Sequence, residues 1–334
     1  MINRVRNAIK GALYGVAVGD ALGAPLEFMS AEEIKNEHGY VAEMIGGGWL
    51  NTEPGEITDD TQMTLAVAEG IVANPNEPVE EVGARFIKWA NSGPKDIGGT
   101  CSSSIRGARS KAEDEKSKTA DRPTFARWKD ASMNTAVKNG KHSGGNGALM
   151  RTVFPGLFYR DSQEAVQKAS DIGRMTHWDD ESDEACKLYT RIVHSFIEIE
   201  RTSANGADEA KKKEKKDTAF RRILKGTIYD TKKLKGEQDK LKPGGYVVDS
   251  MKCAVYFFLQ AESFEKAVAD AANFGGDADT IAAITGGLAG AYCGYEAIPP
   301  RWSEALAPDV RVRLDELADA AVERRTAESG NTHQ

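Results

Sequence analysis

Apolar residues recur at spacings of three and four along most of the chain, the spacing of one face of an α-helix. Strict alternation of apolar and polar residues is scarce, so the pattern predicts an all-α fold with few or no strands. Four segments show the helical spacing most clearly: Val5, Ala8, Ile9, Ala12, Leu13 and Val16; Met63, Ala66, Val67, Gly70 and Ile71; Ile281, Ile284, Leu288 and Tyr292; and Val310, Leu314, Leu317 and Ala321.

Glycine and proline indicate where several helices end and how closely they pack. Gly93-Pro94 should end the helix that carries Phe86 and Trp89, and Pro299-Pro300 should end the helix before them. The run Ile281–Gly294 contains four glycines and four alanines. Glycine costs a helix about 1 kcal/mol relative to alanine, so close approach of a second helix is the expected compensation. Such packing would draw the helix ends around a common point.

The composition narrows the class of protein. A chain of 334 residues with 40% hydrophobic and 28% charged residues can bury a substantial core. The net charge of -7 argues against a nucleic-acid-binding protein, which is usually basic. Cys101, Cys186, Cys253 and Cys293 are far apart in the sequence, so neither a zinc site nor a disulfide framework is expected.

The N-terminal region and the length of the apolar runs indicate whether the protein is exported or crosses a membrane. Arg4, Arg6 and Lys10 precede the apolar stretch Gly11–Gly19 and faintly imitate a signal peptide, but Asp20 interrupts the stretch. No run of 18 uncharged apolar residues occurs in the chain, so no membrane span is predicted. We therefore expect a cytoplasmic protein, and a monomer.

A basic segment departs from the acidic average. Residues 201–242 hold 14 Lys and Arg against 7 Asp and Glu, and Lys211–Lys216 has five lysines in six positions. Charge runs usually form solvated, salt-bridged helices, although a docking surface for an acidic partner is the alternative. We expect one domain over residues 1–325 that includes this excursion, followed by a flexible tail over residues 326–334.

The first acidic motif is Thr58-Asp59-Asp60-Thr61, between a turn-like stretch and an apolar helix. Taken alone it is a good helix cap, because Thr and Asp accept hydrogen bonds from the free N–H groups of a first helical turn. A second motif, Asp277-Ala278-Asp279-Thr280, also precedes a small-residue helix. A cap needs one side-chain oxygen, not two carboxylates and a threonine at two separate helices.

Facing motifs of this kind would place four carboxylates in one pocket. Their mutual repulsion would be severe, and bound cations would relieve it. All-oxygen ligands suit hard cations such as magnesium, manganese or calcium rather than zinc. The sequence therefore offers a candidate metal site at the start of two helices.

Other segments carry weaker signals. Gly19–Glu27 is either a helix end with a proline stop or a segment that places the Glu27 carboxylate in the pocket. Gly144–Arg151 is a glycine-rich loop opening a helix, whose free N–H groups could bind a diphosphate, although an ordinary loop fits as well. Asp96, His177 and Tyr246 could border a ligand or simply satisfy local packing.

Together these segments resemble the ADP-ribosylglycohydrolase family. The matching pieces appear in the family's order: GDALGAPLE at Gly19–Glu27, TDDT at Thr58–Thr61, DIG at Asp96–Gly98, GGNGALMR at Gly144–Arg151, TH at Thr176–His177, GGYVV at Gly244–Val248 and GGDADT at Gly275–Thr280. The resemblance implies a compact orthogonal bundle of helices with two Mg²⁺ or Mn²⁺ ions at the bottom of a cleft. It implies six metal ligands: Thr58, Asp59, Asp60, Asp277, Asp279 and Thr280.

The resemblance also implies the remaining roles. Gly144, Gly145, Asn146 and Gly147 would cradle ADP-ribose, and His177 and Tyr246 would border it. The implied reaction cleaves the bond between ribose C1″ and an arginine of an ADP-ribosylated protein, releasing ADP-ribose. Glu27 or Asp59 would take the proton of water, and Asp96 would lie beside the scissile sugar.

Two alternatives to arginine-directed hydrolysis stay open. One is a hydrolase of another linkage, such as serine-linked ADP-ribose, O-acetyl-ADP-ribose or a modified nucleic acid. The other is a module that binds ADP-ribose without cleaving it, for which lost metal ligands would be the signature.

Overall fold

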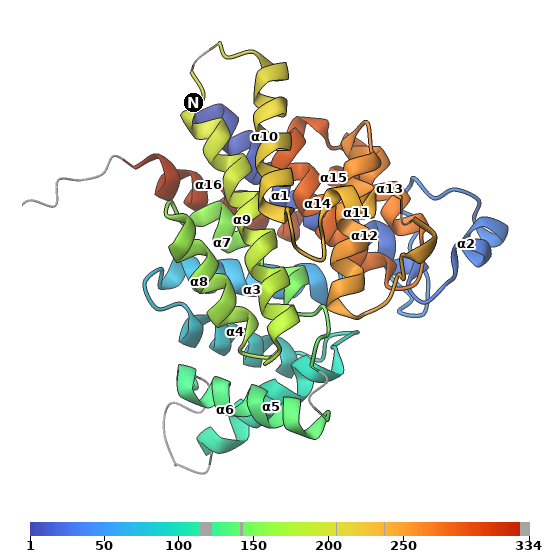
Figure 1. The fold of residues 1–334 in the computed structure, drawn as a ribbon. Coiled ribbons are helices and arrows are strands. Elements are labelled where there is room, and N and C mark those ends of the chain that lie inside the picture. The colour runs from blue at the N-terminus through green and yellow to red at the C-terminus, as the bar shows by residue number, and fades with distance from the viewer. Residues whose placement is uncertain (114–121, 141–142, 205, 237, 328–334) are drawn as a thin grey trace, which may run out of the picture.

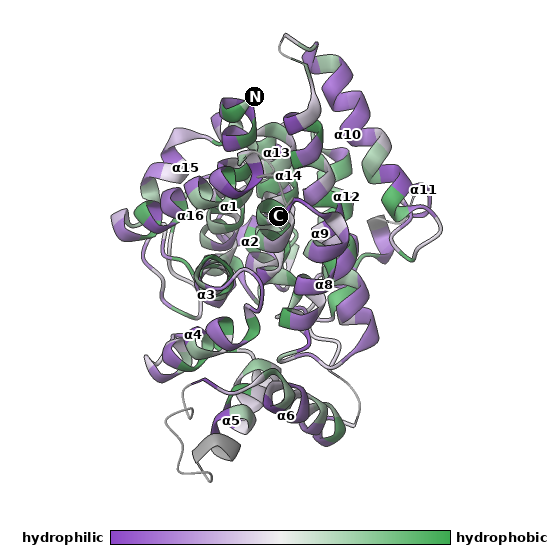
Figure 2. Ribbon diagram, turned by 90° about the vertical axis from the view of Figure 1, so that its left-hand side faces the viewer, coloured by the Kyte–Doolittle hydropathy of each residue, from purple (hydrophilic) through white to green (hydrophobic). Residues whose placement is uncertain are grey.

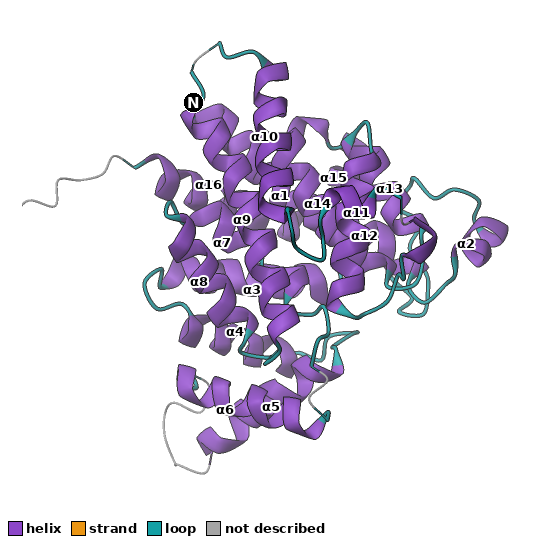
Figure 3. Ribbon diagram, in the orientation of Figure 1, coloured by secondary structure: helices purple, strands orange, loops and turns teal. Residues whose placement is uncertain are grey.

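The predicted helical periodicity is present in the computed structural model, which describes residues 1–113, 122–140, 143–204, 206–236 and 238–327. Within these ranges the secondary structure is helical and contains no β-strand, so the all-α prediction is confirmed (Figure 3). The α-helices are α1 (Ile2–Gly23), α2 (Ala31–Glu37), α3 (Asp59–Ala73), α4 (Val79–Asn91), α5 (Gly99–Glu113), α6 (Phe125–Lys138), α7 (Val153–Phe158), α8 (Ser162–Gly173), α9 (Asp180–Thr202), α10 (Glu209–Leu224), α11 (Thr231–Leu234), α12 (Val247–Gln260), α13 (Phe264–Asn273), α14 (Ala278–Cys293), α15 (Pro300–Ala305) and α16 (Pro308–Thr326).

Helices α1 and α14 lie antiparallel at the centre of the molecule, with α3, α7, α9, α12, α13 and α16 packed around one or both of them (Figure 1). Helices α5 and α6 pack on α4 at the lower end of the same view. Every fourth residue of α1 from Gly11 to Gly23 is a glycine, and each lies against a backbone carbonyl of α14. A Cβ on Gly15 would overlap the carbonyl oxygen of Gly286, and one on Gly19 would overlap that of Ala282. The small residues of α14 are therefore explained by backbone-to-backbone packing, as the sequence predicted.

This packing determines where the acidic residues meet. Because the two helices are antiparallel, the C-terminal end of α1 lies beside the start of α14, where Asp277 and Asp279 are found. A 3₁₀ turn (Ala24–Leu26) follows α1 directly and leads into Glu27. The start of α3 also contacts α1. Three helix ends thus converge, as the small-residue pattern predicted.

One predicted helix end is wrong. Helix α14 ends at Cys293, and Gly294 follows with φ of 88°, its N–H donating to the carbonyl of Gly290. Pro300 is the first residue of α15, not the stop of the helix before it. Glycine with positive φ commonly ends a helix and proline is favoured in a first helical turn, so Gly294 ends α14 and Pro300 begins α15. The predicted end of α4 before Gly93-Pro94 is confirmed.

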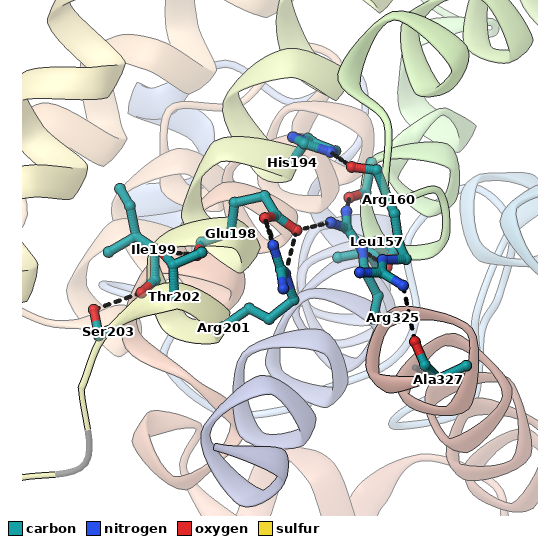
Figure 4. Close-up of polar contacts among 11 residues, drawn as sticks. Leu157, Arg160, His194, Glu198, Ile199, Arg201, Thr202, Ser203, Arg325 and Ala327 are labelled. Atoms are coloured by element: carbon teal, nitrogen blue, oxygen red, sulfur yellow. Dashed lines mark hydrogen bonds and ion pairs between the residues drawn. The ribbon is translucent and has the colours of Figure 1, made fainter. Parts of the chain in front are cut away.

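The C-terminal helix is fastened through a buried arginine. Arg325 on α16 is fully buried and donates to the carbonyl oxygens of Gly156 and Leu157 at the end of α7 (Figure 4). It also forms an ion pair of 2.5 Å with Glu198 on α9, whose carboxylate is shared with Arg201. Three helices distant in sequence are joined by this network.

The predicted tail falls largely outside the described residues. Thr326 is the last residue of α16, and the carbonyl of Ala327 accepts a hydrogen bond from Arg160. Residues 328–334 are not described. Within the described chain, no helix is both long enough and apolar enough to cross a membrane.

The basic segment forms α10 and α11 at the edge of the molecule, where α10 is conspicuously polar (Figure 2). Two of its lysines are nevertheless buried against Glu200 of α9. Lys216 lies 2.8 Å from that carboxylate and also donates to the carbonyl of Tyr292, and Lys212 lies 3.2 Å from Glu200. The predicted salt bridges are present for these two lysines, but their side chains are buried rather than solvated and attach α10 to the bundle.

Candidate active site

A cleft of about 600 Å³ opens where the ends of α1, α3 and α14 converge. Carboxylates lie on one side and glycine-rich loops on the other. Of the residues predicted for the site, those that line the cleft are Glu27, Asp59, Asp96, Gly145, Asn146, Gly147, His177, Asp277, Asp279 and Thr280. Thr58 and Asp60 are buried beneath the cleft, and Gly144 and Tyr246 lie beside it rather than on its lining.

Asp20 is a fully buried carboxylate at the base of the site, and no role is predicted for it from the sequence. It accepts hydrogen bonds from the backbone N–H of Thr58 at 3.0 Å and of Thr61 at 3.1 Å, and from both threonine hydroxyls. It therefore caps α3 from a different helix. The available signal was an aspartate within an otherwise apolar helical run.

This arrangement decides against the capping interpretation of the first motif. Thr58 occupies the N-cap position of α3 but accepts no capping hydrogen bond. Because Asp20 satisfies the helix start, the carboxylates of Asp59 and Asp60 are left for other partners. At α14, Asp277 likewise makes no capping bond, although the N–H of Thr280 donates to Asp279.

The carboxylates form two overlapping clusters. Oxygen atoms of Asp20, Asp60 and Asp279 lie within 4.8 Å of one another, and so do those of Glu27, Asp277 and Asp279. Asp279 belongs to both clusters. Either set has the oxygen-only chemistry and spacing that could hold a hard divalent cation. Asp20 and Glu27 are additions to the predicted ligand set.

One carboxylate oxygen of the first cluster lacks a hydrogen-bond partner. Oδ1 of Asp60 is buried and has no hydrogen-bond partner, while Oδ2 accepts from the hydroxyl of Thr280 at 3.2 Å. A buried carboxylate oxygen without a partner is costly in a folded protein. A cation bound between Asp60 and Asp279 would satisfy it, so the residues present fit a metal ion.

The surroundings of the buried carboxylates favour their protonated, neutral forms over their charged forms. Burial raises the pKa of Glu27 to about 8, with further contributions from the charges of Asp277 and Asp96. Burial likewise raises the pKa of Asp20 to about 6, although its four hydrogen bonds oppose the shift. No Lys or Arg is among the described residues that line the cleft, so none of these residues balances the negative charge there.

The innermost carboxylates show the same effect more strongly. Burial, followed by repulsion from neighbouring carboxylates, raises the pKa of Asp59, Asp60 and Asp279 well above the ordinary value. Asp96 is only half-buried, and burial followed by the charge of Asp277 raises its pKa too. Positive charge placed among these groups would reverse the shifts.

The opposite wall consists of two loops joined by backbone hydrogen bonds. The N–H of Asn146 donates to the carbonyl of Gly245, and the N–H of Val247 donates to that of Gly144. The side-chain amide of Asn146 then donates to Asp277 at 2.7 Å, so the wall is tied to the acidic side. A three-residue 3₁₀ turn (Leu149–Arg151) follows this loop and α7 begins only at Val153, so the helix that the loop was expected to open starts later than predicted.

His177 and Arg151 support this wall from behind. Arg151 is fully buried and donates to the carbonyl of Gly147 at 2.8 Å and to the hydroxyl of Thr176. Burial, and next the charge of Arg151, lower the pKa of His177 to about 3, so the imidazole is neutral. A Cβ on Gly145 or Gly147 would lie 3.2 Å from the His177 ring, which explains why the loop has glycine there.

Two further residues border the cleft. Tyr246 is 43% exposed, and its hydroxyl donates to Glu181 on α9. Glu27 accepts a hydrogen bond of 2.6 Å from the indole N–H of Trp49, a residue that the sequence analysis did not select.

Comparison with known proteins agrees with this arrangement. The sequence profile of the ADP-ribosylglycohydrolase family matches residues 1–331. The chain is 31% identical to the ADP-ribosyl-[dinitrogen reductase] glycohydrolase of Rhodospirillum rubrum, over 95% of this chain and 96% of that protein. It is 30% identical to the ADP-ribosylarginine hydrolase Tri1 of Serratia proteamaculans, over 91% of this chain and 76% of that protein. A solved structure titled ADP-ribosylglycohydrolase-related protein complex superimposes with a TM-score of 0.70 at 27% identity, covering 97% of this chain and all of that one.

Proposed function

From the premise that the chain belongs to the ADP-ribosylglycohydrolase family, hydrolases that act on glycosyl bonds, we propose that it removes ADP-ribose from arginine side chains of modified proteins. The observation that carries the proposal is the double carboxylate cluster around Asp279, with the unpartnered oxygen of Asp60 inside it. The arginine assignment is supported by the similarity to an ADP-ribosylarginine hydrolase and by Asp96 at the cleft.

The proposed cofactors are two divalent cations, Mg²⁺ or Mn²⁺. Asp20, Asp60 and Asp279 would hold one, and Glu27, Asp277 and Asp279 the other. The hydroxyls of Thr58 and Thr280 and the carboxylate of Asp59 are proposed as further ligands. When bound, such ions supply Lewis-acid chemistry and offset the carboxylate charge.

The reaction breaks the bond between C1″ and the arginine nitrogen and forms a bond between C1″ and the oxygen of water. Glu27 or Asp59 receives a proton from that water, and Asp96 gives a proton to the departing nitrogen. The transition state has oxocarbenium character, which the surrounding carboxylates stabilise electrostatically. With its pKa near 8, Glu27 would hold its proton at neutral pH, so its use as a base requires positive charge beside it.

The opposite wall would hold the rest of the substrate. The loop that contains Gly145, Asn146 and Gly147 is proposed to receive the ADP part, together with His177 and Gly144, and Tyr246 would border it. Asn146 would also orient Asp277 through its amide. A monomer is proposed as the active unit. The four free cysteines suit a reducing compartment such as the cytoplasm.

The alternatives differ in the acceptor or in catalysis itself. A hydrolase of serine-linked ADP-ribose or O-acetyl-ADP-ribose would use the same carboxylates with a different acceptor side. A module that only binds ADP-ribose is disfavoured, because such a module is expected to have lost metal ligands. Here both motifs contain all the residues that the family resemblance implies as ligands.

The test is turnover of defined substrates. Arginine-linked and serine-linked ADP-ribosyl peptides and O-acetyl-ADP-ribose would be incubated with the protein in EDTA, Mg²⁺ or Mn²⁺, and ADP-ribose release measured. We expect release from the arginine-linked peptide that requires a divalent cation and is lost in D279A. Full release by D279A, or binding of ADP-ribose with no release from any substrate, would contradict the proposal.

A further inference from the structure

Two aromatic side chains stand exposed at the edge of the cleft. Phe28 is 69% exposed and Trp49 is 52% exposed, and their ring centroids lie 5.4 Å apart at an interplanar angle of 44°. Phe28 lines the cleft and directly follows Glu27 in the chain. The two rings contact each other, and both adjoin Glu27: Phe28 follows it in the chain and Trp49 donates to its carboxylate.

Phe28 has an unfavourable backbone conformation that hydrogen bonds hold in place. Its φ is 67°, in the left-handed region that bulky residues rarely adopt. Its N–H donates to the carbonyl of Gly276 at 2.6 Å, and the N–H of Gly276 donates to the carbonyl of Met29 at 2.7 Å. The strained residue is thereby fixed to the segment that leads into Asp277.

Trp49 is fixed in a different way. It follows Gly46, Gly47 and Gly48, all of which have positive φ. A Cβ on Gly48 would lie 2.7 Å from the carbonyl oxygen of Pro25, so this loop packs directly on the turn before Glu27. The indole N–H then donates to the Glu27 carboxylate at 2.6 Å. Ring and carboxylate are held together.

We infer that Phe28 and Trp49 form a platform for the acceptor, and that it binds the planar guanidinium group of an ADP-ribosylated arginine. This inference rests on the proposed function. A guanidinium stacks well on aromatic faces, and its charge is favoured by carboxylates nearby. The cleft that Phe28 lines also holds the carboxyl groups of Glu27, Asp96 and Asp277. A serine acceptor offers neither the planar surface nor the positive charge.

Trp49 also acts as a positioning residue for the Glu27 carboxylate. Its N–H donates to Glu27, while its ring packs beside that of Phe28. The two contributions can be separated, because phenylalanine keeps an aromatic ring but has no N–H. W49F should therefore retain the KM for substrate and lower kcat, whereas W49L should raise KM as well.

The experiment compares F28N, W49L and W49F with the wild-type protein on an arginine-linked ADP-ribosyl peptide. The inhibition constant of free ADP-ribose is the reference. F28N removes the ring, and asparagine tolerates the left-handed backbone. We expect F28N and W49L each to raise KM roughly 2- to 30-fold, the range of a cation–π contact, and to leave the ADP-ribose inhibition constant within twofold. The matched control is F125N, at an exposed phenylalanine on α6 that is not part of the cleft lining.

The outcomes separate this inference from the proposed function. If the wild-type protein cleaves the arginine linkage but F28N and W49L leave KM unchanged, the platform is overturned while the function stands. It is overturned as well if both variants weaken ADP-ribose binding as much as they raise KM, because the rings would then support the whole cleft. Absence of arginine-linked turnover in the wild-type protein would remove the proposed function itself.

Discussion

The carboxylate of Asp20 accepts hydrogen bonds from both the backbone N–H and the hydroxyl of Thr58, at 3.0 and 2.7 Å, although the residues are 38 positions apart. A helix therefore receives its N-terminal cap from another helix. The consequence is chemical as well as structural, since the two aspartates that follow Thr58 are released from capping: Asp59 lines the cleft and Asp60 lies buried beneath it.

Replacing this cap should destabilise the protein. In D20A, buried N–H and hydroxyl donors of Thr58 and Thr61 lose their acceptor, and we expect a loss of about 2–4 kcal/mol in the free energy of unfolding. Urea denaturation measures it. The control is D319A, at a half-exposed aspartate paired with Arg6, which should change stability by less than about 0.5 kcal/mol. Equal effects of the two variants would refute the cross-helix cap.

The charge of Asp60 should have opposite effects with and without cations. D60N removes a buried negative charge while keeping the side chain's shape. In EDTA we expect D60N to be more stable than the wild-type protein at pH 8, because carboxylate repulsion is reduced. In Mn²⁺ we expect the order to reverse and activity to fall roughly 10- to 100-fold or more. Thermal unfolding in both buffers checks the crossing, and a stability order that is the same in EDTA and Mn²⁺ would count against a metal at this residue.

The raised pKa of Glu27 predicts a pH dependence of stability. The folded protein keeps a proton on Glu27 up to about pH 8, whereas the unfolded chain releases it near its ordinary pKa of 4.5. The stabilising contribution is therefore complete below about pH 4.5 and is lost as the pH rises to about 8.

E27Q cannot lose this proton, so it isolates the effect. In EDTA, its free energy of unfolding relative to the wild-type protein should rise between pH 5 and pH 8 by a few kcal/mol at most. Comparing the two proteins cancels the contribution of other groups, such as the neutral His177. A difference that stays constant over this range would show that Glu27 is already ionised in the cation-free protein.

The packing of α1 on α14 should not tolerate a methyl group. In G15A the new Cβ would overlap the carbonyl oxygen of Gly286, and backbone atoms cannot move aside as a side chain can. We expect a loss of about 3 kcal/mol and weaker cation binding, because the helix ends that carry the carboxylates would shift. G236A is the control, since a Cβ there meets no atom within 4 Å. Wild-type stability of G15A would show that the helices can separate at little cost.

The buried Arg325 should be required for docking of the C-terminal helix. R325M leaves the carbonyls of Gly156 and Leu157 without their donor, although Glu198 keeps Arg201 as a partner. We expect about 3 kcal/mol of destabilisation by chemical denaturation, with activity retained at temperatures where the variant is folded. R324M, at the exposed neighbour, is the matched control and should be close to wild type.

Much of the fold could be predicted from the chain because helix faces repeat locally. The apolar spacing of residues 5–16 and 281–292 identified two central helices, and the glycines of α14 predicted close packing. Position within a helix is a short-range property, so it can be read from a few turns of sequence. Pro299-Pro300 was misread because proline is compatible with both the end of one helix and the start of the next.

The candidate site was only partly accessible from sequence. Repeated acidic motifs pointed to Asp60 and Asp279, whereas Asp20 lay in the Gly19–Glu27 motif without a predicted role and Trp49 lay in no motif. Whether Asp20 caps α3, or whether Thr280 reaches Asp60 from 220 positions away, depends on how α1, α3 and α14 pack. The sequence by itself determined which helices form and which carboxylates stand at their ends. Only the tertiary structure decided which of those carboxylates share one buried space, because that depends on the backbone contact between two glycine-rich helices and not on any local pattern.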